Sequence, residues 1–158
     1  MIVTNKLKRF RRNYAIRPRK HKRLHYLSQY RLKDSTIDEF CDWVLHWCHA
    51  KFGGHPYKEV PCVEWEWKDR WYQKKNLLAL YDREDNIIQL RIQGHRTFNN
   101  LAKTLIHEYI HYLQWSPKRY EEWDAQYGYS NNPYEIEAEH LAQVYWGDCI
   151  TQVMRWME

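Results

Sequence analysis

Two histidines stand four residues apart in the segment His107-Glu108-Tyr109-Ile110-His111. At this spacing two side chains lie on one face of an α-helix, with their Cβ atoms about 5–6 Å apart, so both imidazoles can bind one metal ion. Histidine ligands of this kind favour zinc, which lowers the pKa of a bound water to about 7. Glu108 follows the first ligand and can take the proton from that water. The motif therefore predicts His107 and His111 as zinc ligands and Glu108 as the general base of a hydrolase.

A catalytic zinc needs a third protein ligand, and residues 134–142 contain several acidic side chains. If this segment is helical, Glu137 shares a stripe with three apolar residues. These are Leu141, Val144 and Tyr145. A carboxylate on a buried face is costly unless it is paired or binds a metal. We therefore predict Glu137 as the third ligand.

The other polar residues of this segment have simpler explanations. Glu135 fits position N3 of a helix that Asn132 caps, and Glu139 fits a solvated or ion-paired position. Glu135 and His140 remain the alternatives for the third ligand.

The two metal-binding segments must be held by helices, and the sequence predicts both. Apolar residues with a period of 3.6 run through residues 97–114, which contain the histidine pair. Pro117 is expected to stop this helix, and residues 118–131 are expected to form a loop or a short helix. Residues 132–157 start with Asn-Pro, which is typical of a helix N-terminus, and are predicted to form the last helix.

The remaining elements come earlier in the chain. A period of 3.6 predicts a helix over residues 35–52, which Gly53 ends. Residues 60–67 alternate between apolar and polar types and predict a strand. Two apolar runs, residues 77–81 and 87–92, flank a polar loop and predict a β-hairpin. This order predicts an α+β fold, in which helices cover one face of a small three-stranded antiparallel sheet.

Charge divides the chain near residue 33. Residues 1–33 carry 12 Lys and Arg and no acidic residue, whereas residues 34–158 carry 13 basic and 20 acidic residues, so the formal charges are +12 and −7. We predict a basic N-terminal arm over residues 1–33, of the kind that is often disordered, and one domain over residues 34–158. Tyrosine and histidine are interleaved with the charges of residues 6–33, which suits nucleic acid, since phosphates bind cations and bases stack on rings. The alternative is an arm that folds onto the acidic domain or only aids solubility.

Cysteine usage and hydropathy indicate a compartment. The 4 Cys form no C-x-x-C pair, and Cys41 and Cys48 are too far apart along a helix for a disulfide, so free thiols and a reducing compartment are expected. His46 and His49 share a side of that helix, but Cys48 points elsewhere, so we expect no second metal there. No run of 18 apolar residues is present, and no apolar segment follows the basic N-terminus as in a secretory signal. We therefore expect a cytoplasmic protein.

The two motifs together resemble the zincin metallopeptidases of the glutamate-ligand type. The likeness rests on H-E-Y-I-H at residues 107–111 and on Y-E-I-E-A-E-H-L-A at residues 134–142, and it extends over about residues 35–157. Small intracellular zincins of the ImmA/IrrE-like group have a similar E-A-x-x-x-A segment, although this sequence has His140 where that group has an apolar residue. The SprT-like group is similar in size and architecture, but it usually has histidine as the third ligand. The histidine-containing extension of the metzincins does not follow His111.

The resemblance implies a small zincin-like domain that hydrolyses peptide bonds. It implies His107, His111 and Glu137 as zinc ligands and Glu108 as the general base. It also implies an edge strand along which a substrate peptide lies, and residues 60–67 are the expected strand.

A peptidase also needs a hydrogen-bond donor for the oxyanion of its tetrahedral intermediate. Tyr127, Tyr129 and Tyr134 lie between the two metal-binding segments, and Tyr134 is our candidate.

Two functions therefore compete. One is a zinc metallopeptidase that acts on a protein or peptide. The other is a non-catalytic zincin-fold binding protein whose basic arm binds nucleic acid. Glu108 favours the first, because a purely structural zinc site does not need that carboxylate.

Overall fold

The computed structural model of the chain describes residues 34–66, 77–95, 97–114 and 116–158. The basic arm predicted over residues 1–33 lies outside these ranges. The helices, strands and short 3₁₀ turns follow in the order α2 (Asp34–Phe52), β1 (Cys62–Glu66), β2 (Ala79–Asp82), β3 (Ile87–Arg91), η2 (Ile92–Gly94), α4 (Phe98–Leu113), α5 (Pro117–Tyr127), η3 (Tyr129–Asn131) and α6 (Pro133–Met157). The described chain is therefore α+β, as predicted.

The sheet has the strand order β1-β3-β2, and it is mixed rather than antiparallel. Strands β2 and β3 form the predicted antiparallel hairpin. Strand β1 runs parallel to β3, with Cys62 opposite Ile87 and Glu66 opposite Arg91. The prediction of an all-antiparallel sheet was wrong because an alternating pattern fixes which side chains face the core, and it does not fix the direction of the neighbouring strand. Val63 and Trp65 pack against the core in the expected way.

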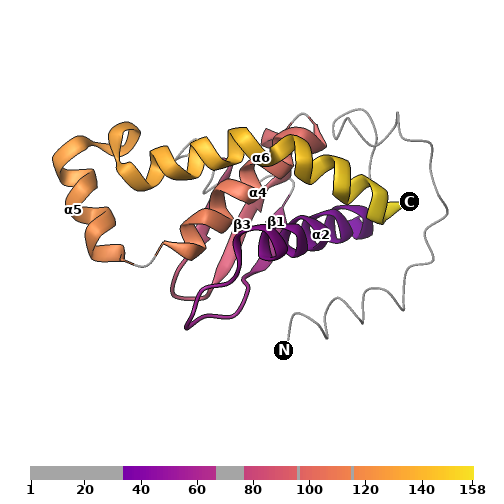
Figure 1. Cartoon of the computed structure of the whole chain (residues 1–158), viewed down its shortest axis with the longest axis horizontal. Helices are drawn as coiled ribbons and strands as arrows, with labels where there is room; N and C mark the ends of the chain where they lie inside the picture. Colours follow the sequence, from indigo (N-terminus) through magenta and orange to yellow (C-terminus); the bar gives the residue numbers. More distant parts are fainter. Residues whose placement is uncertain (1–33, 67–76, 96, 115) are drawn as a thin grey trace.

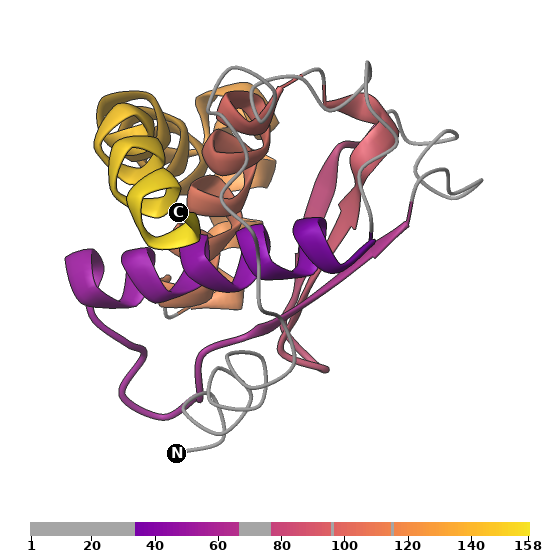
Figure 2. The ribbon, with the colours of Figure 1, turned by 90° about the vertical axis from the view of Figure 1, so that its right-hand side faces the viewer.

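Helices cover one face of this sheet. Figure 2 shows α4 and α6 on one side of the strands, with α2 running across the view from this helical side to the sheet. The long helix α6 packs against both α4 and α2, and α5 lies beside the N-terminal end of α6 (Figure 1). The core is formed by apolar residues of the sheet and of the helices α2, α4 and α6, and α5 contributes none. The largest fully buried side chains are Tyr109, Tyr112, Phe40, Phe98, Ile37, Ile88, Leu90, Ile92, Leu101, Leu105 and Ile106.

Local signals set the ends of the helices. Helix α2 ends where Gly53 adopts a φ of +80°, a conformation that a residue with a Cβ rarely adopts. Helix α4 starts at Thr97, whose side chain accepts a hydrogen bond from the main-chain N–H of Asn100. Pro117 lies beyond the end of α4, as expected, and it is also the first residue of α5. The side chain of Ser116 caps this helix. The short-helix alternative for residues 118–131 is therefore the one observed.

Three of the four cysteines, Cys41, Cys48 and Cys149, are buried, and Cys62 is exposed; none of the four forms a disulfide bond, as expected. None of the helices in the described ranges combines the length and the apolar composition needed to span a membrane.

Candidate metal centre

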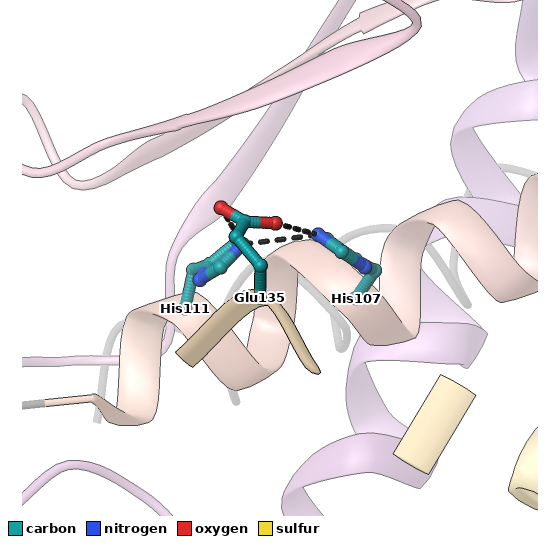
Figure 3. Close-up of side chains that lie close together, drawn as sticks. All are labelled: His107, His111 and Glu135. Atoms are coloured by element: carbon teal, nitrogen blue, oxygen red, sulfur yellow. Dashed lines mark hydrogen bonds and ion pairs between the residues drawn. The ribbon is translucent and has the colours of Figure 1, made fainter. Parts of the chain in front are cut away.

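His107 and His111 lie one turn apart on α4 and point toward Glu135 in the first turn of α6 (Figure 3). Nε2 of His107 is 3.2 Å from Oε2 of Glu135, and Nε2 of His111 is 3.3 Å from Oε1. The two Nε2 atoms are 3.0 Å apart. Within the described part of the chain, these three side chains form the group of His, Cys, Asp and Glu whose ligand atoms lie within 4.8 Å of one another. The structure thus brings the histidine pair to a buried carboxylate.

Close packing of α6 against α4 places this carboxylate. Ala138 and Ala142 follow Glu135 on the buried face of α6, at spacings of three and four residues. Their short side chains allow the two helices to approach closely. Asn132 fixes the start of α6, because its Oδ1 accepts from the main-chain N–H of Tyr134 at 3.0 Å. The first turn of α6, and Glu135 with it, is therefore held over the histidines.

Glu135, and not the predicted Glu137, faces the histidine pair. Glu137 is exposed, and so is Val144, which belonged to the stripe that we expected to be buried. The expectation that Glu137 lies on a buried stripe was wrong, because Leu141 and Tyr145 of that stripe are only partly buried against the core. Where two helices approach closely, the smaller residues, here Ala138 and Ala142, occupy the contact instead.

The neighbouring polar residues of α6 also differ from expectation. In a capping box the side chain of Glu135 would accept a hydrogen bond from the main-chain N–H of Asn132. That N–H instead donates to the carbonyl of Tyr129, so Glu135 does not cap the helix. His140, the other alternative ligand, is exposed and is not part of the cluster. Glu139 is exposed and ion-paired, with its Oε2 at 3.6 Å from Nδ1 of His107.

Tyr120 of α5 completes the surroundings of Glu135. Its hydroxyl donates to Oε1 of Glu135 at 2.6 Å, and its ring centroid lies 6.1 Å from that of His111. The ring of Tyr134, our candidate from the sequence, stacks on the ring of Tyr120. Tyr120, and not Tyr134, lines the cavity at the cluster. Burial, and then the hydrogen bond to Glu135, raise the pKa of Tyr120. The hydroxyl is therefore a neutral donor at neutral pH.

His111 and Glu135 shift the pKa of each other toward the charged forms. Burial alone would raise the pKa of Glu135, but hydrogen bonds from His107, His111 and Tyr120 outweigh it and hold this pKa well below its ordinary range. Burial alone would lower the pKa of His111, but the hydrogen bond to Glu135 and the charge of Glu108 raise it. Glu135 is thus an anion at neutral pH, which is the form that binds a metal cation.

Glu108 lies between the cluster and the sheet. It is only 7% exposed, and its Oε2 accepts a hydrogen bond from the main-chain N–H of Tyr81 in β2 at 2.8 Å. Burial raises the pKa of Glu108, and the charges of His111 and His107 act against this rise. A carboxyl group with a raised pKa is closer to the value that suits proton transfer at neutral pH.

Two cavities meet at this site. The smaller, of about 220 Å³, is lined by the whole cluster together with Glu108, Tyr120 and Tyr129. The larger, of about 600 Å³, extends along α4 from the start of β2 and is lined in part by Leu78, Thr104 and Glu139. Both are lined by Leu77, Ala79, His107, Glu108 and Tyr129. A molecule in this groove would therefore contact His107 and Glu108 directly.

Sequence reasoning did not single out Tyr120. It lies in a segment without a clear pattern, and nothing in its sequence context distinguishes it from the other tyrosines nearby. Of the three tyrosines considered, Tyr129 lines both cavities, while Tyr127 and Tyr134 line neither.

The chain matches no protein-family model, and the comparisons with curated proteins and with solved structures gave no match. The interpretation of the site therefore rests on its own geometry.

Proposed function

We propose that this protein is a zinc-dependent metallopeptidase with a zincin-like fold. The observation that supports this most strongly is the convergence of His107, His111 and Glu135 next to the buried carboxylate of Glu108, at a groove. Two histidines and a glutamate are a ligand set that catalytic zinc sites use, with a fourth position left open.

The spacing of the ligand atoms fits a zinc ion. Two ligand atoms about 2.0–2.1 Å from one tetrahedral zinc lie roughly 3.3 Å from each other. The observed separations of 3.0, 3.2 and 3.3 Å are close to that value. His111 and Glu135 are buried, His107 is half-buried, and the set includes an anion, as suits a cation site. His107, His111 and Glu135 would therefore hold the ion. In this ligand set Glu135 replaces Glu137, which we had expected from the sequence.

Zinc in such a site supplies Lewis-acid chemistry, because it lowers the pKa of water and polarises a carbonyl group. Glu108 takes the proton of the attacking water and passes it to the leaving amine. The N–H of Tyr81 keeps one carboxylate oxygen of Glu108 in place, so the other can face the groove. The hydroxyls of Tyr120 and Tyr129 lie at the same cavity and would donate hydrogen bonds to the oxyanion, Tyr120 by turning its single hydrogen away from Glu135.

The groove also supports an extended peptide as the substrate. Among the described strands β2 lies at an edge of the sheet, and its residues Ala79, Leu80 and Tyr81 line the smaller cavity. An edge strand can pair with a peptide through main-chain hydrogen bonds. The strand next to the site is therefore β2 and not β1, which we had expected from the sequence and which forms the opposite edge of the sheet.

The test is hydrolysis of an unfolded protein and of a random peptide mixture, followed by mass spectrometry. We expect cleavage by the zinc-loaded protein, no cleavage after chelation, and recovery when zinc is restored. Activity that survives complete chelation would refute a metallopeptidase.

A second candidate function rests on the charge of +12 in residues 1–33 against −7 in residues 34–158. We propose that this arm binds nucleic acid, either to recruit the peptidase or, in a non-catalytic protein, as the main activity. Salt titration of DNA binding should show a steep loss of affinity for the full chain. A full-length variant with the Lys and Arg of residues 6–33 changed to Gln should lose the binding. Equal binding by both proteins would exclude the arm as the binding element.

A further inference from the structure

The two histidines differ in the partner of Nδ1, the ring nitrogen that does not face the other histidine. Nδ1 of His111 lies 2.7 Å from Oε1 of Gln114, and both side chains are buried. Nδ1 of His107 instead lies 3.6 Å from Oε2 of Glu139, whose side chain is 74% exposed. His111 therefore has the closer and more buried partner of the two.

Contacts on all sides fix Gln114 itself. Its main-chain N–H donates to the carbonyls of Ile110 and His111, and its carbonyl accepts from Nη1 of Arg83 at 2.9 Å. Its side-chain Nε2 donates to the carbonyl of Tyr134 at 2.9 Å and to Oε2 of Glu137 at 3.1 Å. Both hydrogens of the side-chain amide of Gln114 therefore donate to acceptors on α6.

This arrangement determines the tautomer of His111. Because Nε2 of Gln114 faces two acceptors, Oε1 must be the atom that faces His111. Nδ1 of His111 is then the protonated nitrogen and donates to Oε1. A ring that binds a metal must lose its other proton, so Nε2, on the side of Glu135 and His107, is then the nitrogen that presents the lone pair. A metal ligand must present its lone pair in this way.

We infer that Gln114 is a positioning residue that fixes the metal-binding tautomer of His111 and, through Tyr134 and Glu137, holds the first turn of α6 over it. Glu137, at the far end of this chain of hydrogen bonds, acts through Gln114 and not as a ligand. The inference rests on the proposed metal site. It adds that the site is assembled by an amide that bridges the end of α4 and the start of α6.

The test measures zinc affinity by competition with a chromophoric chelator, on the full chain. Gln114→Ala should lower the affinity about 10- to 100-fold, the usual effect of removing an outer partner of a ligand. Gln126→Ala, at an exposed glutamine of α5, is the matched control and should change the affinity less than twofold. Glu139→Gln should have an effect smaller than threefold, because that contact is long and exposed. Equal affinity of Gln114→Ala and the control would overturn the inference.

A pair of variants separates positioning from a general loss of folding. Gln114→Glu removes the amide donor and places a second carboxylate beside Glu137, so zinc affinity should fall. Adding Glu137→Gln returns an amide to the pair, and the double variant should recover at least tenfold of the lost affinity. No recovery in a double variant that folds, by circular dichroism, would count against the proposed connection.

Nitrogen NMR of the histidine side chains gives a readout that does not depend on activity. In the zinc-loaded protein His111 should carry its proton on Nδ1, with slow exchange that Gln114→Ala accelerates. A proton on Nε2 would overturn the inference while leaving the metal site intact. A wild-type chain that binds no zinc would instead overturn the proposed function.

Discussion

The main-chain N–H of Tyr81 donates a hydrogen bond to Oε2 of Glu108 across 2.8 Å. This contact joins the edge strand β2 to the helix that carries the histidine pair. It fixes the carboxylate of Glu108 relative to the strand on which a peptide would lie. The sheet therefore positions the proposed base as well as the proposed substrate.

Replacing this carboxylate separates catalysis from metal binding. In Glu108→Gln the amide oxygen can still accept from Tyr81, so fold and zinc content should stay near wild type. Peptidase activity should fall about 10²- to 10⁴-fold, the usual contribution of general acid–base catalysis. The measurement is kcat/KM together with zinc content on the same preparation. Wild-type activity in this variant would show that Glu108 is not the base.

Tyr120 can be tested by removing only its hydroxyl. Tyr120→Phe deletes the donor to Glu135 and the proposed donor to the oxyanion, while the ring can still pack against Tyr134. If the hydroxyl acts on the oxyanion, kcat should fall about 10²- to 10³-fold, as for other donors of this kind. Tyr127→Phe, at an exposed position at the end of α5, is the control. A loss confined to zinc affinity would limit Tyr120 to supporting Glu135.

The close approach of α4 and α6 predicts sensitivity to larger side chains. Ala138→Leu should overpack the contact, lower the free energy of unfolding by about 1–3 kcal/mol and move Glu135 away from the histidines. Urea denaturation and zinc titration measure the two effects. Val144→Leu, on the exposed side of the same helix, should change neither. Equal behaviour of the two variants would show that the small residues do not set the helix distance.

Zinc should stabilise the folded chain, because the ligands come together only when α4 and α6 are packed. At a free zinc concentration about 100 times the dissociation constant, the stabilisation is about 2.7 kcal/mol. For a domain of this size that is a rise in Tm of roughly 5–10 °C. Thermal denaturation before and after chelation measures it. In His107→Ala the shift should vanish, and a shift that persists there would indicate zinc bound elsewhere.

Much of the fold could be predicted from periodicity and helix caps. The three long helices and the β2–β3 hairpin lie close to their expected positions, since each is set by local patterns. The parallel pairing of β1 with β3 could not be predicted, because strand direction depends on the path of the connecting chain. Tyr120 reaches the cluster through the packing of α5, which local sequence does not encode.

The choice between Glu135 and Glu137 shows where the pattern was misread. The spacing of Glu135, Ala138 and Ala142 indicates a helix face made for close contact, and this signal was available in the sequence. The larger residues beside Glu137 were given more weight, although a long helix that packs on one side only leaves some of them exposed. Val144 is one of those residues, at 53% exposure.

Zinc content by plasma mass spectrometry should be compared among wild type, Glu135→Ala and Glu137→Ala, each purified with zinc supplied at neutral pH. We predict about one zinc per chain in wild type, most of it retained in Glu137→Ala, and little in Glu135→Ala. Zinc lost from Glu137→Ala but kept in Glu135→Ala would contradict the ligand set of His107, His111 and Glu135. Absence of zinc from the wild-type protein would contradict the metallopeptidase itself.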